Sequence, residues 1–355
     1  MINQLILKNF TAFNQKGIAV DFSSKINVII GENGTGKTHL LKAAYSLCAG
    51  AGLFKNKPDT TEDDLQAALT SKLVRVLMPL DEKLGKLHHQ GGTEQTHLQA
   101  KFDRDQQITA TFFNNSKAIA IQNRKNYEQY QAEAVYIPTK EVLSFMKGFN
   151  SLYEKYGLSF DQTYQDICLL LDLPPIRQEI LEASAKWAMD EIKHICGGNF
   201  IFYGGGNVTF KTENAEFSAN AMAEGYRKLG ILSRLLETGA IHPGISGPLF
   251  WDEPECNMNP QLMKLLVEVL LELSRKEQQI ILATHDYLLL KWFNVLKTQH
   301  DHVRYHSLYR DAKTGEIKID STDDYLEIEK NPIAEAFNQL TIAHAKSRLK
   351  RGELE

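Results

Sequence analysis

The sequence predicts an α/β protein built on a mixed sheet, with a flanking antiparallel β subdomain and a short helical insertion. Three observations support this fold class. A glycine-rich loop joins an apolar stretch to an apolar helical pattern near the N-terminus. Two further short apolar stretches, each ending in polar residues, follow more than two hundred residues later. Between the loop and these two stretches, residues 97–123 are rich in β-forming residues or alternate between apolar and polar residues as strands do. Residues 141–197 have the apolar spacing of helices.

The N-terminal loop predicts a phosphate-binding site. Val28 to Ile30 predicts a buried strand, residues 31–38 (GENGTGKT) fit G-x-x-x-x-G-K-[ST], and an apolar helix follows. Glycines let backbone N–H groups point at phosphate oxygens, and the helix N-terminus adds partial positive charge. Lys37 then reaches the β- and γ-phosphates, and the Thr38 hydroxyl ligates Mg²⁺. The nucleotide-contacting residues expected here are Asn33, Gly34, Thr35, Gly36, Lys37, Thr38 and His39.

The stretch "GPLFWDEPECNMNP" predicts a short apolar strand that ends in two carboxylates. In a sheet beside the loop strand, Asp252 is placed to hold Mg²⁺, and Glu253 to polarise the water that attacks the γ-phosphate. A helix with an apolar stripe and the strand Ile280 to Ala283 come next, followed by His285. Because strand C-termini line the ligand crevice of an open α/β sheet, His285 is expected to reach the γ-phosphate.

In this order, the loop, "LFWDEPE" and "ILATHD" resemble the ATP-binding-cassette ATPases. Residues 5–47 are most similar to the RecF/SMC/Rad50 branch, and within it to small OLD-like predicted AAA ATPases (AAA_15 or AAA_21 type) associated with phage defence. The resemblance implies a P-loop ATPase head with ATP and Mg²⁺ as ligands. It also implies a homodimer or higher oligomer that closes around ATP.

In such proteins a signature segment, usually L-S-G-G-Q/E-R, completes the ATP site of a second copy. "MAEGYRK" lies in its place, with Ala223, Glu224 and Gly225 at the Ser-Gly-Gly positions. Ala223 lacks the phosphate-binding hydroxyl and Glu224 adds a negative charge, so anion binding should be weaker. Arg227 or Lys228 would have to compensate; an ordinary helix start is the alternative.

The loop that usually carries a Mg²⁺-contacting Gln also departs from the family pattern. Its place is taken by "AVYIPTKEVLS", which has no Gln. Lys140 or Glu141 would substitute, or the segment is a surface turn. We therefore expect ATP hydrolysis to be slow or partner-stimulated.

The resemblance predicts an ATPase head over 1–140 and 198–355 and a helical insertion over 141–197. OLD-like relatives often carry a fused TOPRIM nuclease, and this chain ends too soon for one. The expected effector is therefore a separate protein such as a nuclease, in an anti-phage system. Two alternatives stay open: a RecF-like DNA-repair clamp, and a non-hydrolysing ATP-sensing scaffold. A transporter subunit is disfavoured by the altered signature and the missing Gln.

Composition and charge give little evidence for nucleic-acid, metal or membrane binding. The net charge of −4 gives no global argument for nucleic acid, although the basic "AHAKSRLKRG" leaves DNA or an acidic partner as alternatives to a solvated helix end. The four cysteines form no metal or redox motif. No apolar run reaches ~18 residues and the N-terminus lacks a signal-peptide profile. A cytoplasmic protein without a membrane partner is expected.

Overall fold

The computed structural model describes residues 1–56 and 59–350, apart from the side chains of 51, 55, 56 and 350. Its centre is a mixed sheet of strand order β14-β13-β3-β12-β11-β7, in which every neighbouring pair is parallel except β13 and β14. The strands are β3 (Ile26–Gly31), β7 (Val135–Ile137), β11 (Leu249–Asp252), β12 (Ile280–Ala283), β13 (Val303–Arg310) and β14 (Ile317–Thr322).

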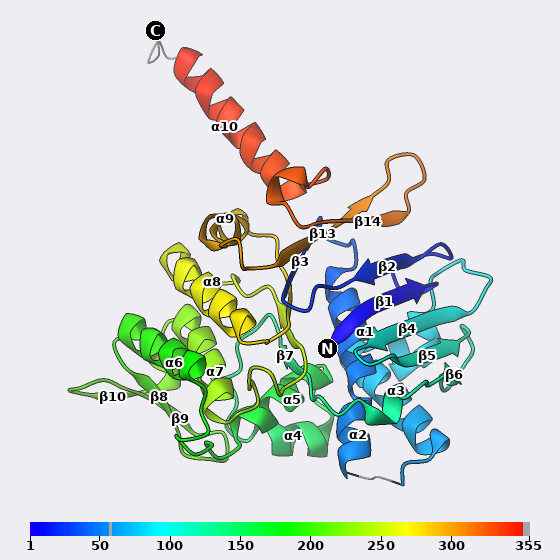
Figure 1. Cartoon of the computed structure of the whole chain (residues 1–355), viewed down its shortest axis with the longest axis horizontal. Coiled ribbons are helices and arrows are strands. Elements are labelled where there is room, and N and C mark those ends of the chain that lie inside the picture. Colours follow the sequence, from blue (N-terminus) through cyan, green and yellow to red (C-terminus); the bar gives the residue numbers. More distant parts are fainter. Residues whose placement is uncertain (57–58, 351–355) are drawn as a thin grey trace.

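Two antiparallel sheets flank this centre (Figure 1). The larger has the order β2-β1-β4-β5-β6 and is the predicted β subdomain: β1 (Ile2–Lys8), β2 (Ile18–Asp21), β4 (Thr96–Phe102), β5 (Gln106–Phe112) and β6 (Ala120–Asn123). The smaller has the order β10-β9-β8: β8 (Asn199–Phe202), β9 (Val208–Lys211) and β10 (Glu216–Ser218). The turn at Gly204 to Gly206 joins β8 to β9, and all three glycines have positive φ.

The helices are α1 (Lys37–Cys48), α2 (Gly50–Asn56), α3 (Glu62–Leu77), α4 (Phe149–Tyr156), α5 (Gln162–Leu171), α6 (Ala183–Cys196), α7 (Glu224–Glu237), α8 (Pro260–Arg275), α9 (Tyr287–Leu296) and α10 (Pro332–Lys350). Short 3₁₀ turns cover Leu80–Glu82, Leu84–Leu87, Tyr127–Gln129, Ala219–Ala221 and Tyr325–Glu327.

Strands β3, β11 and β12 are buried along their whole length and are mostly apolar, because both faces of the sheet are covered there. Side chains alternate between the faces. Ile26, Val28 and Ile30 enter a core shared with α4 to α8, whereas Ile29 enters the core between this sheet, α1, α3 and the larger antiparallel sheet. The helical segment therefore packs into the same core as the nucleotide-side strands. The boundaries at 140 and 197 stay a prediction.

Three local sequence patterns predict features that differ in the structure. The polar stretch "KNKPDTTEDD" (55–64) predicts a linker, but Thr61 and Asp64 form a capping box that starts α3; residues 57–58 lie outside the described chain. The pattern from Ser159 to Gln162 predicts a capping box, but Asp161 caps α5 by accepting from Thr163 N. The sequence predicts a helix from Ile176, but α6 begins at Ala183. In each case a competing polar side chain or an irregular segment sets the helix start.

Gln279 joins the central sheet to the antiparallel sheet. Its buried amide accepts from Ile2 N at 3.0 Å and donates to the carbonyls of Ile2 and Ser23, both at 2.8 Å. Gln279→Ala should lower the free energy of unfolding by about 2–4 kcal/mol, because buried backbone groups lose their partners. Urea unfolding measures this. Gln122→Ala, at an exposed strand position, should cost under ~0.5 kcal/mol; equal effects of the two variants would refute the assignment.

Candidate functional site

The parallel register brings three segments to one edge of the sheet. Ile29 lies opposite Ala283, and Ala283 lies opposite Asp252. The phosphate loop follows β3, Thr284 and His285 follow β12, and Glu253 follows β11, so all emerge at the same strand ends. This is the crevice at which α/β sheets bind ligands.

The phosphate loop is held in the conformation that its glycines allow. Gly34 and Gly36 have φ of 77° and 94°, where side chains are disfavoured. A Cβ on Gly36 would also lie 2.8 Å from Cζ of Phe13. Thr35 donates its hydroxyl to the Glu32 carbonyl at 2.8 Å, while Asn33 and Gly34 form the exposed tip.

Lys37 is folded back into this loop. Its Nζ donates to the carbonyls of Gly31 and Glu32 at 2.7 and 3.1 Å, and the residue is 7% exposed. Burial lowers the pKa of Lys37, and the nearby acids, Glu253 first among them, oppose that shift. The ammonium therefore lies inside the loop, among the carboxylates that follow β11.

Thr38 and Asp252 meet across 214 residues of sequence, with Oγ1 donating to Oδ1 at 3.2 Å. The Tyr136 hydroxyl donates to Oδ2 at 3.4 Å, and the Thr139 side chain also bonds this carboxylate. Asp252 is 4% exposed and burial raises its pKa. A buried carboxylate beside a hydroxyl is a set of hard oxygen donors that fits Mg²⁺. No group of three or more metal-binding side chains occurs among the described residues, so protein ligands would form only part of the shell.

Glu253 and His285 are neighbours, as their predicted roles require. His285 Nδ1 lies 3.3 Å from Glu253 Oε1, and half of the His285 side chain is exposed. Glu253 adopts φ of 51°, and its N–H donates to Ala283 O at 2.9 Å, which turns the chain at the end of β11.

Glu255 is a site residue to which sequence reasoning assigned no role. Its Oε1 accepts from Thr284 Oγ1 at 2.8 Å and from His285 N at 3.0 Å, and burial raises the pKa of its carboxyl. It thereby ties the segment after β11 to the segment after β12. The signal in the sequence is the last acid of "DEPE", whose partners are revealed only by the fold.

The signature-like segment starts α7 without a side-chain cap. Ala223 is the exposed N-cap residue, and its side chain makes no capping hydrogen bond to the first amides of the helix; its carbonyl accepts from the N–H groups of Tyr226 and Arg227. Glu224 accepts from Asn257 Nδ2 at 3.0 Å, and Gly225 packs closely against Met258 and Leu262. Among the described residues, no hydrogen bond or ion pair joins Ala223–Gly225 to the phosphate loop of the same chain.

Neither neighbouring cation lies free beside this helix start. Arg227 donates to the carbonyl of Met222, and its Nε forms a buried ion pair with Glu141 Oε1 at 2.8 Å. Lys228 is 1% exposed and donates to Glu253 O at 3.2 Å. Both side chains therefore bond to groups of their own chain, and compensation by these residues stays a prediction.

The loop after β7 lies between the acidic strand end and helix α7. Lys140 is exposed, and Glu141 is buried against Arg227. Thr139, which sequence reasoning passed over, is the residue of this loop that bonds Asp252. The loop thus contacts the acidic strand end through a hydroxyl and the signature helix through a carboxylate.

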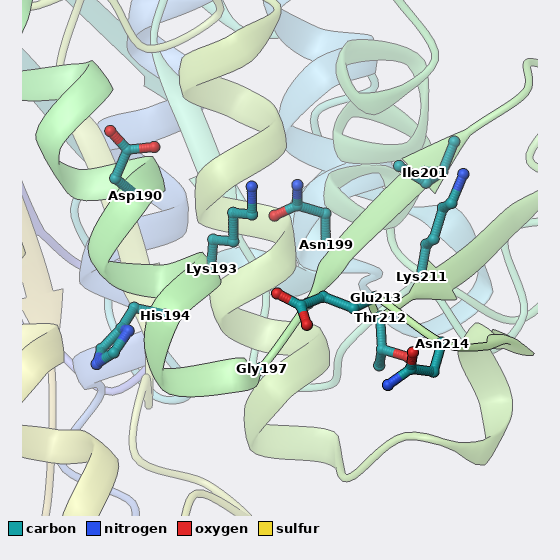
Figure 2. Close-up of a pocket in the computed structure, with 11 residues that line it drawn as sticks. Asp190, Lys193, His194, Gly197, Asn199, Ile201, Lys211, Thr212, Glu213 and Asn214 are labelled. Atoms are coloured by element: carbon teal, nitrogen blue, oxygen red, sulfur yellow. The ribbon is translucent and has the colours of Figure 1, made fainter.

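His39 lies in the first turn of α1 and lines a cavity of about 970 Å³ whose other walls include Thr11, Ala12 and the segment 85–92. Its buried Nδ1 has no hydrogen-bond partner among the described residues, and burial lowers the pKa of the imidazole. A second hollow, of about 750 Å³, lies between α6 and the β8–β9 hairpin (Figure 2). It contains none of the predicted site residues.

Two family models match the chain. Residues 1–170 match one described as "AAA ATPase domain", and residues 209–291 match one described as "AAA domain, putative AbiEii toxin, Type IV TA system". The described residues contain no helix long and apolar enough to cross a membrane.

Curated relatives match over short stretches. The chain is 44% identical over 64 residues to the DNA replication and repair protein RecF of Oenococcus oeni, covering 18% of this chain and 16% of that protein. It is 28% identical over 137 residues to RecF of Flavobacterium johnsoniae, covering 39% and 31%. The chain thus spans less than a third of the length of these relatives.

Solved structures match over nearly the whole chain. An SMC head domain from Thermotoga maritima has a TM-score of 0.51 at 12% identity, covering 91% of this chain and 99% of that one. An Smc head domain with a coiled coil and joint from Pyrococcus yayanosii has a TM-score of 0.57 at 10% identity, covering 95% and 99%. At such identities the likeness is one of fold.

The chain combines a phosphate-loop motif with a fold like that of SMC head domains. Parts of the chain are thus similar to AAA ATPase domains and to RecF, and its fold is similar to that of SMC head domains.

Replacing the buried Asp252 carboxylate should affect the stability of the nucleotide-free protein and its stabilisation by Mg²⁺ in different ways. Burial raises its folded pKa, so at neutral pH its charge costs stability, a cost that disappears as the pH falls through that pKa. Asp252→Asn should leave the nucleotide-free protein as stable as wild type or up to ~1 kcal/mol more stable. It should abolish the extra thermal stabilisation that Mg²⁺ gives with ATP. Scanning fluorimetry measures both effects, and exposed Asp81→Asn should change neither.

Proposed function

We propose that this protein is an ATP-binding and ATP-hydrolysing switch, two copies of which close around two nucleotides. The observation that carries the proposal is the convergence of Lys37, the Thr38–Asp252 contact at 3.2 Å and the Glu253–His285 pair at 3.3 Å. These groups come from three separate strand ends, and each has the chemistry that one part of phosphoryl transfer needs.

ATP binding uses the loop and the helix behind it. The phosphates accept from the loop amides, and Lys37 exchanges the carbonyls of Gly31 and Glu32 for phosphate oxygens. Thr38 and Asp252 would hold Mg²⁺, which when bound neutralises phosphate charge. The base lies in the cavity lined by His39, whose imidazole favours the neutral form because burial lowers its pKa.

Hydrolysis depends on the Glu253–His285 pair. Glu253 accepts the proton of the attacking water, because its carboxylate lies at the strand end where the γ-phosphate points. His285 donates to the γ-phosphate and reports its presence. Glu255 holds the His285 backbone through the bond at 3.0 Å, which keeps the imidazole beside Glu253.

The second copy completes the site through the uncapped start of α7. The first amides of this helix are free to meet a γ-phosphate across the interface. Ala223 contributes no hydroxyl, and Glu224 is engaged by Asn257, so closure is weak and turnover slow. The cycle acts on a separate effector such as a nuclease, in an anti-phage system; co-purification with the product of a neighbouring reading frame tests that step.

A RecF-like DNA-binding role is the second candidate, and the partial matches to RecF favour it. ATP-dependent retention of duplex DNA by the purified protein would select this role over the effector switch.

Glu253→Gln should lower the steady-state rate of ATP turnover by at least ~100-fold, because the group that accepts the proton of water is lost. The variant should still bind ATP. Its ATP-bound dimer should persist on sizing because hydrolysis no longer releases it. Exposed Glu277→Gln is the matched control. Wild-type protein that binds ATP without measurable turnover would instead indicate the non-hydrolysing scaffold.

Ala223→Asp should improve the α7 cap yet repel the γ-phosphate of the other copy. We expect unchanged or higher thermal stability and loss of turnover. Mixing it with Lys37→Ala, itself inactive, should restore about a quarter of wild-type turnover, because each mixed dimer keeps one intact composite site. No recovery on mixing would mean that the two halves of the site act within one chain.

A further inference from the structure

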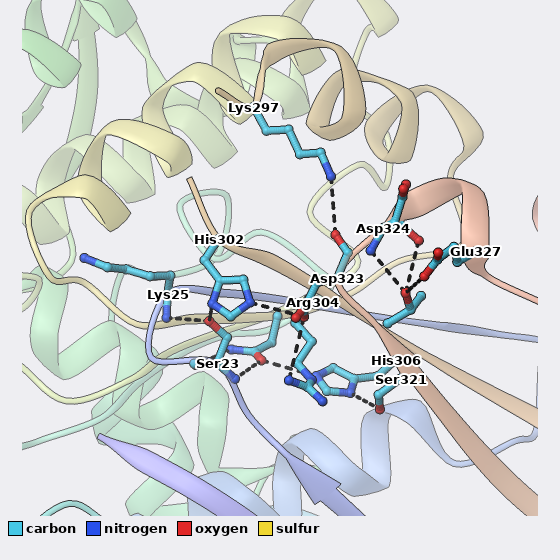
Figure 3. Close-up of polar contacts among 12 residues, drawn as sticks. Ser23, Lys25, Lys297, His302, Arg304, His306, Ser321, Asp323, Asp324 and Glu327 are labelled. Carbon is cyan, nitrogen blue, oxygen red and sulfur yellow. Dashed lines mark hydrogen bonds and ion pairs between the residues drawn. The ribbon is translucent and has the colours of Figure 1, made fainter. Parts of the chain in front are cut away.

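A chain of polar side chains joins three segments at the edge of the central sheet away from the nucleotide site (Figure 3). Ser23 Oγ lies 3.0 Å from His302 Nδ1, and His302 Nε2 lies 3.1 Å from Asp323 Oδ1. Ser23 is 5% exposed, and its hydroxyl accepts from Lys25 N at 3.1 Å. The serine is therefore closed to a substrate, and the network fixes the starts of β3 and β13 against the end of β14. A different part of the fold leaves backbone groups open.

Strand β8 has one edge without a neighbouring strand. It is the last strand of the smaller antiparallel sheet, whose order is β10-β9-β8. Tyr203 N–H donates to Asn207 O at 3.0 Å, and this bond sets the phase of the β8–β9 ladder. Because Ile201 bonds to β9 in the same phase, the backbone groups of Phe200 and Phe202 turn away from β9. Among the described residues, no hydrogen bond from another segment reaches the N–H or C=O of either phenylalanine.

A groove runs along this free edge (Figure 2). Hollows of about 170 and 750 Å³ lie side by side between α6 and the β8–β9 hairpin, and they share residues of α6 and β8. Every residue from Gly198 to Phe202 lines the smaller hollow, whereas a hollow over one face of a strand would meet alternate residues. The free edge therefore faces the groove. Helix α7 forms the floor through residues one turn apart, which are Gly230, Ser233, Arg234 and Glu237.

The free edge lacks the features that usually keep an edge strand from pairing. Charged side chains and proline commonly blunt such edges. Strand β8 reads Asn-Phe-Ile-Phe, with neither a charge nor a proline, and its three apolar residues are half-buried. Helix α6 stands opposite this edge but leaves the hollows between them open. Unpaired backbone groups on an apolar strand beside an open groove form a template for an added strand.

Two charged side chains of α6 stand on the wall of the groove. Asp190 and Lys193 are exposed and line both hollows. Neither side chain forms an ion pair or a hydrogen bond within the part of the chain that the structure describes. Figure 2 shows α6 running to Gly197 and β8 returning beside it, so Lys193 lies nearer to Asn199 than Asp190 does. The wall therefore offers a cation near the start of β8 and an anion toward its end.

We propose that an extended segment of another protein adds to the free edge of β8 as a further strand. Its backbone pairs with the outward N–H and C=O groups of Phe200 and Phe202. Every second side chain of the added strand points to the α7 floor, where Ser233 is small and Ile192 forms the apolar side of the smaller hollow. An apolar side chain is therefore selected at these positions.

The side chains between them point outward and carry opposite charges. A carboxylate near the start of β8 meets Lys193, and a cation near its end meets Asp190. A phosphate backbone fits poorly, because Asp190 and Glu213 line the larger hollow together with Lys193 and Lys211. A small ligand would leave most of the outward backbone groups unpaired. The row of donors and acceptors therefore favours a polypeptide, and binding needs no nucleotide.

Peptide selection on the full-length chain tests the proposal. Short random peptides displayed on phage are selected on wild type and counter-selected on Ser233→Phe, whose ring fills the space beneath the added strand. Selected peptides should alternate apolar and polar residues and bind wild type at least about tenfold more tightly than Ser233→Phe. Ser151→Phe, at an exposed position of α4, is the matched control and should bind like wild type. Thermal melts confirm that both variants fold.

Backbone methylation separates strand addition from docking by side chains alone. A single N-methyl group is moved along the tightest peptide, and calorimetry measures each affinity. Binding should weaken at least about tenfold at every second position, because those N–H groups donate to the carbonyls of Phe200 or Phe202. The positions between them should tolerate the methyl group.

Charge exchange tests the assigned direction of the peptide. Asp190→Lys/Lys193→Asp keeps the net charge, should weaken the selected peptide about tenfold, and should regain affinity for a peptide whose own charges are exchanged. Affinities that ignore this exchange overturn the proposal, as does a methyl scan without alternation. The absence of any peptide that prefers wild type to Ser233→Phe also overturns it. So does a change of oligomeric state in Ser233→Phe on sizing, which would assign the free edge to a second copy.

Discussion

The parallel pairing of β3, β12 and β11 is the constraint on which the site depends. It places the end of each strand at one edge, with Ile29, Ala283 and Asp252 in register. The phosphate loop and the acidic strand end are 214 residues apart in sequence, and a shift of one residue would turn Asp252 to the other face. The continuous apolar character of these strands holds that register, because both faces are buried in separate cores.

The edge gathers charges that are individually costly to bury. Lys37 and Asp252 are each less than a tenth exposed. Burial lowers the pKa of Lys37 and raises the pKa of Asp252, so it favours the neutral form of each side chain. Their interactions with loop carbonyls, Thr38 and Tyr136 offset part of that cost. A site of this kind gains most when a triphosphate and a divalent cation supply the missing charges.

Helix α7 connects this edge to the surface that would meet another copy. Arg227 joins the helix to the loop after β7 through Glu141, and Lys228 joins it to the backbone of Glu253. A movement of the loop after β7 or of Glu253 after β11 would therefore also move the exposed start of α7 at Ala223. Glu253 and His285, which are partly exposed, lie at the same strand ends.

The sequence by itself determined the phosphate loop, the apolar strands with their terminal acids and histidine, and the antiparallel subdomain. These depend on local glycine conformation and on the period of apolar residues. It predicted the convergence of Thr38 with Asp252 and of Glu253 with His285 because strand ends of one sheet share an edge. Only the tertiary structure decided that Thr139 rather than Lys140 or Glu141 approaches Asp252, that Glu255 holds the His285 segment, and that Arg227 turns inward. Each of these is a side-chain contact between distant segments, set by packing that no local pattern records.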